Sequence, residues 1–143
     1  MQIDPGPSGR PVQREAKEQE ALFRWRALVV VSGRYPGIEW MFAIPNGAHL
    51  QGDAKRRAMQ WARLKAQGAR AGVSDIFLPV RDHLHQVSGL WIELKAPKPH
   101  AATVSQEQQD WIAAMRREGH AAHVAYGWVQ AVEFINQHYG ITK

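Results

Sequence analysis

Two carboxylates and one lysine lie where two consecutive strands would bring them together: Asp75, Glu93 and Lys95. Successive side chains of a strand face opposite sides, so Glu93 and Lys95 point the same way. A hairpin that turns about Leu84 pairs Asp75 with Glu93, and directly opposed residues share a face. We therefore expect the three side chains to converge at one end of the hairpin.

This trio would need a partner for its negative charge, because two adjacent carboxylates repel and one of them tends to hold a proton. A divalent cation such as Mg²⁺ relieves that repulsion, since it prefers oxygen ligands, and the backbone carbonyl of Leu94 offers a further one. Lys95 could then orient or help deprotonate an attacking water, or stabilise charge on a phosphoryl group. The combination suits metal-assisted phosphodiester hydrolysis. The alternative is a solvated surface strand that follows an ordinary turn aspartate.

Hydrophobic periodicity and chain-breaking residues predict the elements that would position these side chains. Helices are expected over residues 15–32, 52–67, 105–118 and 129–138, and strands over 39–44, 75–80, 88–95 and 121–126. This order predicts a small mixed central sheet flanked by helices, which is an α/β fold. Alternation along the hairpin assigns its even-numbered apolar residues to the core: Ile76, Leu78, Leu90, Ile92 and Leu94. The Pro- and Gly-rich residues 1–13 are expected to form a flexible tail before a single domain of residues 14–143.

The composition limits the possible classes of function. The 143 residues carry 18 Lys and Arg against 13 Asp and Glu, a formal charge of +5, which favours a polyanionic partner. The absence of cysteine excludes a disulfide scaffold, a thiolate metal site, an iron–sulfur cluster and a cysteine nucleophile. The longest apolar run, Ala27–Val31, is too short to span a membrane, and no secretory signal pattern is present. We expect a soluble, cytoplasmic protein without a membrane partner.

The aromatic and histidine residues have simpler interpretations. No histidine forms a helical pair of the kind that binds zinc, so the seven His are expected to be surface or hydrogen-bonded residues. Tryptophans such as Trp61 and Trp111 are expected to pack in or against the core. An aromatic platform that stacks nucleobases is the less favoured alternative.

Short motifs in a fixed order extend this interpretation: Glu18–Trp25, Ala43–Gly47, Gly72–Asp75, Gly89–Lys95, Ser105-x-x-Gln108-x-x-Trp111 and Gly119. Together they resemble the virus-type replication-repair nuclease (VRR-NUC) domain, which belongs to the PD-(D/E)xK nuclease superfamily. The resemblance runs from about Glu18 to the last helix and so covers nearly the whole chain. Ser74 stands where the superfamily's name motif has Pro, a residue without a chemical contribution of its own.

The resemblance implies a restriction-endonuclease-like core and a metal-dependent nuclease that uses Mg²⁺ or Mn²⁺. It makes Asp75 and Glu93 metal ligands and Lys95 the catalytic lysine. It also adds an acid from the first helix and a glutamine from the helix after the site. Gln108 is that glutamine, although Ser105-x-x-Gln108 is also the pattern of a capping box.

For the acid from the first helix we expect Glu18, which would add to the ligands of the metal. Glu18 shares a helix face with Leu22 and Trp25 and should therefore face inward. Glu15 and Glu20 are the alternatives. An acid near the start of a helix is also favoured by the helix dipole alone, without a role in a site.

The resemblance further implies DNA as the partner. Small stand-alone members of the family, often phage-borne, are associated with dimeric cutting of branched DNA, which implies a homodimeric endonuclease acting on structures such as four-way junctions in a bacterial or phage-infected cell. The expected DNA contacts are Arg70, Lys98, Asn46, Lys55 and Arg56. For the last two, on a basic helix, a solvated helix face is the alternative. The rival functions are a non-catalytic nucleic-acid-binding module on the same fold and a restriction-like, sequence-specific nuclease.

Overall fold

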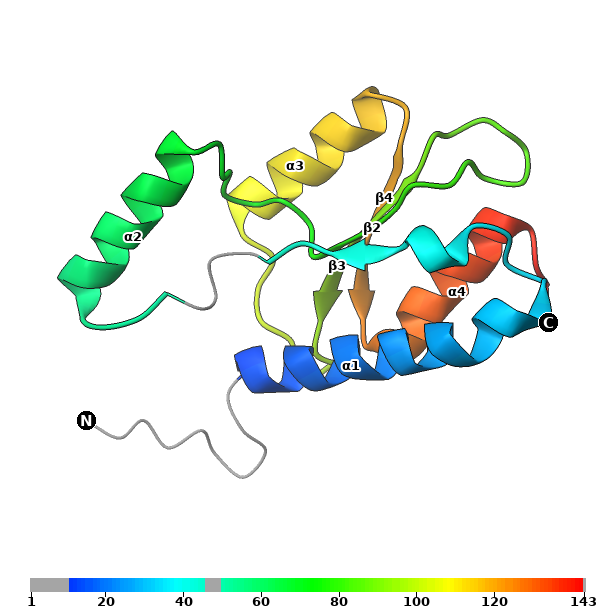
Figure 1. The fold of residues 1–143 in the computed structure, drawn as a ribbon, viewed down its shortest axis with the longest axis horizontal. Helices are drawn as coiled ribbons and strands as arrows, with labels where there is room; N and C mark the ends of the chain where they lie inside the picture. The colour runs from blue at the N-terminus through cyan, green and yellow to red at the C-terminus, as the bar shows by residue number, and fades with distance from the viewer. Residues whose placement is uncertain (1–10, 46–49, 143) are drawn as a thin grey trace.

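The computed structural model describes residues 11–45 and 50–142, which fold around a four-stranded mixed sheet (Figure 1). The strands lie in the order β1 (Phe42–Ala43), β2 (Ile76–Leu78), β3 (Leu90–Lys95) and β4 (Ala121–Tyr126). Strands β1, β2 and β3 pair antiparallel, whereas β3 and β4 run parallel. The helices are α1 (Pro11–Val29), α2 (Ala54–Ala66), α3 (Gln106–Arg117) and α4 (Trp128–Tyr139). The predicted α/β class, a mixed sheet flanked by helices, is confirmed.

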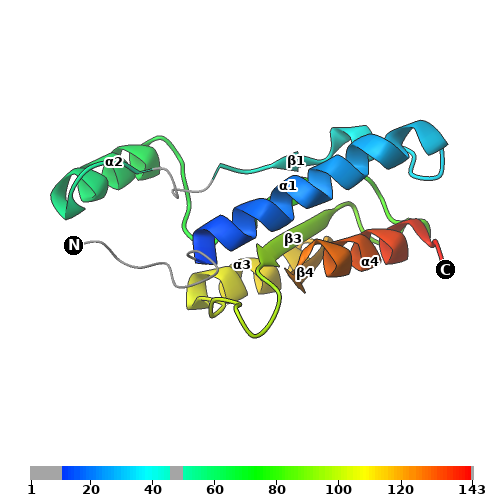
Figure 2. The same cartoon turned by 90° about the horizontal axis from the view of Figure 1, so that it is seen from below.

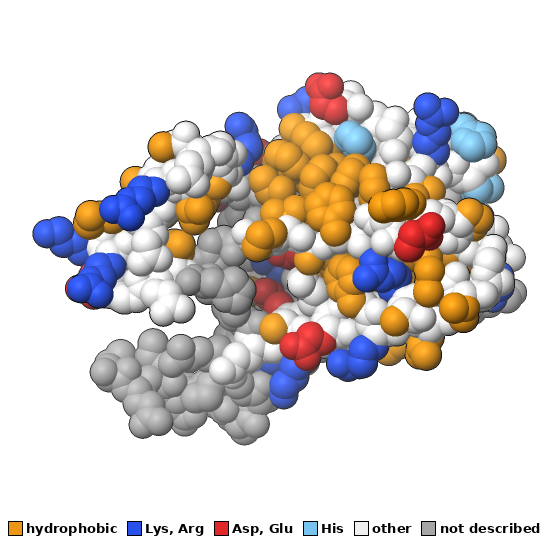
Figure 3. All heavy atoms as spheres, in the orientation of Figure 1, with side chains coloured by type: hydrophobic (Ala, Val, Ile, Leu, Met, Phe, Trp, Pro, Cys, Tyr) orange, Lys and Arg blue, Asp and Glu red, His pale blue; other side chains and the backbone are white. Residues whose placement is uncertain are grey.

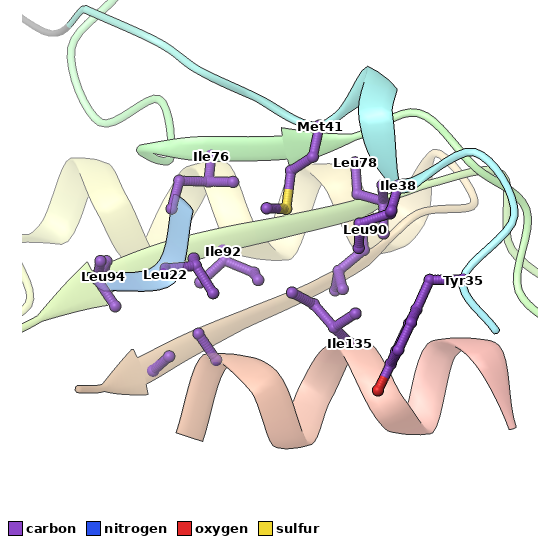
Figure 4. Close-up of a cluster of buried hydrophobic side chains, with 12 residues drawn as sticks. Leu22, Tyr35, Ile38, Met41, Ile76, Leu78, Leu90, Ile92, Leu94 and Ile135 are labelled. Carbon is purple, nitrogen blue, oxygen red and sulfur yellow. The ribbon is translucent and has the colours of Figure 1, made fainter. Parts of the chain in front are cut away.

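The core lies between one face of the sheet and the helices α1 and α4, which run side by side (Figure 2). Leu22 of α1 and Ile135 of α4 are fully buried there. They pack with the even-numbered apolar residues of the hairpin, which are all buried as predicted: Ile76, Leu78, Leu90, Ile92 and Leu94 (Figure 4). Because strand residues alternate, burial of this set fixes the odd-numbered residues on the opposite face.

The register of the hairpin is the one that the sequence predicts. Ile76 pairs with Ile92, and Phe77 pairs with Trp91. A shift of one residue would move the whole apolar set from the core to the other face, so the register is strongly specified by the sequence pattern. The stacked rings of Phe77 and Trp91, 4.1 Å apart between centroids, lie on the opposite face of the sheet.

Helix α3 covers the part of that opposite face formed by β3 and β4. Trp111 of α3 meets Trp91 of β3 edge to face, with ring centroids 5.2 Å apart. The loop before β2 approaches the start of α3 closely at Gly72, where a Cβ atom would overlap the backbone of Glu107. Gly72 also has a φ of 86°, which favours glycine. This position thus ties the segment before Asp75 to the first turn of α3.

Two predicted elements differ in the structure. The expected strand 39–44 is instead a 3-10 turn, Ile38–Trp40, followed by the short strand β1. Ile38 and Met41 are both buried, and a spacing of three residues suits a helical turn rather than a strand. Helix α1 begins at Pro11, four residues before the predicted start, since proline is well tolerated in a first helical turn. Residues 1–10 of the predicted tail, and Asn46, lie outside the described residues.

Helix α2 projects from the body of the domain (Figures 1 and 2) and contains no buried residue. Its first turn is capped locally, because the Asp53 side chain accepts a hydrogen bond from the Arg56 amide at 2.9 Å. Across the described part of the chain, no helix is both long and apolar enough to cross a membrane.

Candidate active site

Four of the predicted site residues lie together where β2, β3 and α3 meet. Asp75 directly precedes β2, and its Oδ2 accepts a hydrogen bond from the backbone amide of Leu94 at 2.8 Å. Glu93 and Lys95 follow on β3, with the Lys95 Nζ 3.7 Å from the Glu93 Oε1. The hairpin register thus brings the two carboxylates and the lysine to one end of the strands. Their roles in chemistry stay predictions.

Gln108, in the first turn of α3, connects this group. Its Nε2 donates a hydrogen bond to the Glu93 Oε1 at 2.7 Å, and its Oε1 accepts one from the Lys95 Nζ at 3.1 Å. The same Oε1 accepts a hydrogen bond from the Ser105 amide at 2.9 Å, which completes a capping box. The sequence allows Gln108 to be either a site residue or a member of the capping box, and in the structure the one side chain contacts the site and closes the capping box.

Burial dominates the electrostatics of the site. Glu93 is 2% exposed and Lys95 5% exposed, so both charged groups are removed from water. The pKa of Glu93 is raised to about 8, first by burial and next by the charge of Asp75, while Lys95 lowers it. A carboxyl group that resists ionisation beside a second carboxylate is poised to gain from a bound cation.

Among the acids of the first helix, Glu15, one of the alternatives to Glu18, is the one whose pKa responds to the charges of Lys95 and Asp75. The pKa of Glu15 is raised by burial, lowered by the charge of Lys95 and raised by that of Asp75. Glu18 instead lies beside Gly127, where an added Cβ would sit 3.5 Å from its Oε1. The sequence contains a signal for Glu15, because residues seven apart stand almost above one another on a helix, and Glu15 precedes the buried Leu22 by seven.

The donor set fits a hard divalent cation. Glu93 Oε2 and Glu15 Oε1 are both buried and have no hydrogen-bond partner among the described residues. Carboxylate oxygens of this kind are the ligands that Mg²⁺ prefers, and Mg²⁺ keeps several waters rather than requiring a complete protein cage. Among the described residues, no three His, Asp or Glu side chains are grouped closely enough to form a ready-made metal site.

The predicted DNA contacts lie outside this group. Lys98 is exposed, and its Nζ is 4.6 Å from the centroid of the Tyr126 ring. Arg70 is exposed in the loop before β2, and Lys55 and Arg56 are exposed in the first turn of α2. Asn46 falls outside the described residues. Ser74, which stands where the superfamily's name motif has Pro, has a fully buried hydroxyl without a hydrogen-bond partner among the described residues.

Comparison with known proteins places this arrangement in a family. The model of the VRR-NUC domain family matches residues 13–128, which is most of the chain. A solved structure described as a VRR_NUC domain protein superposes with a TM-score of 0.70 and 22% sequence identity, covering 91% of this chain and 91% of that one. No curated protein sequence gives a significant match. The fold is thus of the nuclease type, and the chain belongs to the VRR-NUC domain family.

Proposed function

We propose that this chain is a divalent-metal-dependent nuclease that hydrolyses DNA phosphodiester bonds internally. The observation that carries the proposal is the buried Glu93 oxygen without a partner, next to Asp75 and within reach of a buried lysine. A purely structural carboxylate at this depth would be fully hydrogen-bonded, because an unsatisfied buried acceptor is costly. A site that binds a cation during its reaction explains why this oxygen is left open.

Asp75 and Glu93 would hold Mg²⁺ or Mn²⁺, with the Leu94 carbonyl as a further oxygen and Glu15, rather than Glu18, as the acid from α1. The bound ion would supply Lewis-acid charge at the scissile phosphate. The hydrogen bond from the Leu94 amide orients the Asp75 carboxylate before any ion arrives. Glu93 is held in the same way by the Gln108 amide group. This preorganisation reduces the reorganisation that the reaction would otherwise require.

Lys95 would act on the attacking water or on the charge that develops at phosphorus. Its Nζ is held 3.1 Å from the Gln108 Oε1, so the ammonium group keeps one position in the site. Gln108 would be a positioning residue, because its contacts are with Lys95 and Glu93 rather than with the phosphate. Glu93 and Lys95 are two positions apart on β3, so the strand backbone holds both side chains on one face of the sheet.

For the substrate, we propose duplex DNA with a branch, such as a four-way junction, cut by a homodimer. This part rests on the family resemblance and on the basic charge of the chain, +5 at pH 7. Analytical ultracentrifugation at several protein concentrations tests the dimer. A monomer at every concentration that supports cleavage would contradict it.

The test of activity is cleavage of labelled four-way-junction DNA, linear duplex and plasmid, with Mg²⁺, Mn²⁺ or EDTA. We expect the wild type to cut only with a metal and to prefer the junction. Glu93→Gln, which keeps the shape of the side chain, should abolish cutting. Glu118→Gln, on an exposed acid at the end of α3, is the matched control and should cut normally.

Other outcomes would select the rival functions. Tight DNA binding without cutting under any metal would contradict the nuclease and favour a binding module on the same fold. Discrete plasmid fragments at one recurring sequence, without a junction preference, would favour a restriction-like nuclease.

A further inference from the structure

The positive charge of this chain is concentrated in one segment. Residues 54–74, which comprise α2 and the loop before β2, contain six Lys or Arg and no acid. The rest of the chain carries 12 Lys or Arg against 13 acids, so this segment alone accounts for the basic balance. Within residues 11–45 and 50–142, none of the six cations is in an ion pair. The segment is therefore an unneutralised cationic arm.

The arm carries its charges away from the body. Figure 3 shows Lys and Arg side chains projecting from the outer side of α2, with hydrophobic side chains on both sides of the hollow between α2 and the body. Lys55, Arg56 and Arg63 are all exposed. Since a polyanion is attracted to cations that no acid neutralises, the natural occupant of this region is a strand of phosphates.

The hollow itself is a groove of about 650 Å³ with a mainly apolar lining. It lies between α2, the loop before β2, Trp111 of α3, and the residues Ile44, Pro45 and Leu50. Its side chains include Ile44, Trp61, Leu64 and Arg70, and no acid contributes to it among the described residues. We call this the α2 groove.

The α2 groove adjoins the backbone that leads into the candidate active site. The amide of Ile44, which lines it, donates a hydrogen bond to the backbone carbonyl of Asp75 at 2.7 Å. Gly72 and Val73, also in the lining, lead into Asp75 along the chain. The groove wall is therefore joined to Asp75 both along the chain and through one backbone hydrogen bond.

Trp61 gives the groove a surface suited to a flat ring. Its side chain is half-buried in α2 and lines the groove, and the Lys65 Nζ lies 6.0 Å from its ring centroid. An aromatic face with cations nearby is the combination on which proteins stack unpaired bases of nucleic acid strands. A paired base is already stacked within its duplex and is not free to enter such a groove.

We propose that the α2 groove binds one unpaired nucleobase of the DNA substrate against Trp61, while the cations of α2 hold the phosphates on either side. The inference rests on the proposed function for its partner, and it adds a selection rule: DNA with an unpaired nucleotide near the cut is preferred over continuous duplex. An apolar peptide would fill the groove equally well, but it would leave the six cations of the arm without counter-charges.

The test is a binding measurement in EDTA, which separates it from catalysis. Fluorescence anisotropy compares a fully paired duplex with the same duplex carrying one unpaired nucleotide. For Trp61→Ala we expect about a tenfold loss of affinity for the second DNA and less than about a twofold change for the first. Trp40→Ala, on a tryptophan that is 67% exposed elsewhere on the surface, is the matched control and should change neither.

Two further variants guard against a folding artefact. Trp61→Phe keeps an aromatic face and should restore most of the selective affinity. Ala69→Leu narrows the groove without removing Trp61, and it should lower affinity for the DNA with the unpaired nucleotide only. Thermal unfolding of each variant checks that the domain is intact.

The result that would overturn the proposal is an equal effect of Trp61→Ala on both DNAs, or no effect on either. Failure of the proposed nuclease would look different. In that case the wild type would not cut with any metal, yet the selective binding in EDTA would persist. Cleavage by Trp61→Ala at a normal rate and with normal selectivity would contradict the proposed role of the groove. It would leave the proposed nuclease function supported.

Discussion

Two regions of this molecule carry charge in opposite ways. At the junction of β3 and α3, Glu93 and Lys95 are buried and hydrogen-bonded to one glutamine. In α2, five exposed Lys and Arg side chains lie on a helix that buries no residue. The first region holds few charges in fixed positions, and the second holds many in free ones.

The difference reflects what each region would have to do. Chemistry at one phosphorus atom needs groups held to within a fraction of an ångström, and only packed strands and a capped helix provide that. Attraction of a polyanion needs only unneutralised charge, because the force acts over a Debye length of about 10 Å. The core therefore supports the site, whereas the arm depends on local caps.

The largest expected effect is at the buried lysine. Lys95→Met keeps the apolar stem and removes the ammonium group, so we expect the cleavage rate to fall by about 10²- to 10⁴-fold. DNA binding should change little. Lys17→Met, on an exposed lysine of α1 with no expected role in the site or in DNA binding, is the control. Single-turnover experiments measure the cleavage rates of both variants. A nearly normal rate in Lys95→Met would contradict the claim that the buried, fixed charges carry the chemistry.

Metal should stabilise only the buried region. A ligand at about 100 times its Kd adds about 2.7 kcal/mol to the free energy of unfolding. For a domain of this size that is roughly 5–10 °C in the melting temperature. We expect this shift with Mn²⁺ or Mg²⁺ in the wild type and not in Glu93→Gln. In EDTA near pH 7, Glu93→Gln should be close to the wild type in stability, because burial and the charge of Asp75 already raise the pKa of Glu93 to about 8 and favour its neutral form.

The arm should control affinity without controlling stability. Replacing Lys55, Arg56 and Arg63 together by Ala should reduce the slope of log K against log salt by about 2.7. The free energy of unfolding should stay within about 0.5 kcal/mol of the wild type, since these side chains are exposed. Binding isotherms at several salt concentrations and a thermal melt test both statements.

The matched control for the arm is the triple replacement of Arg24, Arg34 and Arg81 by Ala, three exposed arginines outside α2. It removes the same charge and should leave the salt slope almost unchanged. Equal slopes for the two triple variants would mean that net charge matters and position does not.

A buried histidine far from the candidate site also predicts that the stability of the domain depends on pH. Burial lowers the pKa of His138, whose Nε2 donates a hydrogen bond to the Val80 carbonyl at 2.6 Å. Below about pH 6.5 the unfolded chain takes up a proton that the folded state resists, so stability falls as the pH falls. Melting temperatures between about pH 7.5 and about pH 5.5 should drop less in His138→Gln than in the wild type. The exposed His100→Gln should match the wild type.

The smallest effect compares two helix caps. Asp53 caps α2 and Ser105 caps α3, and removal of either should cost about 1 kcal/mol locally. Hydrogen exchange should become faster in α2 alone for Asp53→Ala, with an unchanged melting temperature. Ser105→Ala should lower the melting temperature and slow cleavage. The same response from both variants would mean that α2 is as integrated as α3.

The sequence predicts the buried region well because two independent patterns agree there. The alternation of Ile76, Leu78, Leu90 and Ile92 fixes the faces, and a single register satisfies them all. That register brings Asp75, Glu93 and Lys95 to one end without further information. The family resemblance adds Gln108, whose capping pattern was visible but whose contact with Lys95 was not derivable from spacing.

What the sequence did not predict depends on how separate elements pack. The side of α1 that meets the end of β3 is set by tertiary contacts, and periodicity alone favours two acids, since Glu15 precedes Leu22 by seven residues and Glu18 precedes it by four. The apolar run 39–44 predicts a strand, whereas the structure has a 3-10 turn at Ile38–Trp40, because short apolar runs fit either element. The α2 groove is lined by four segments that are separated in the sequence, so no local sequence pattern predicts it.

The capping box of α3 links the order of the candidate site to the order of the first turn of that helix. Gln108 contacts Lys95 and Glu93 only while the first turn of the helix is closed, since the same Oε1 accepts the Ser105 amide. Opening of this one helical turn would therefore free Lys95 and Glu93 from Gln108 together, so the order of the candidate site depends on the order of a helix end.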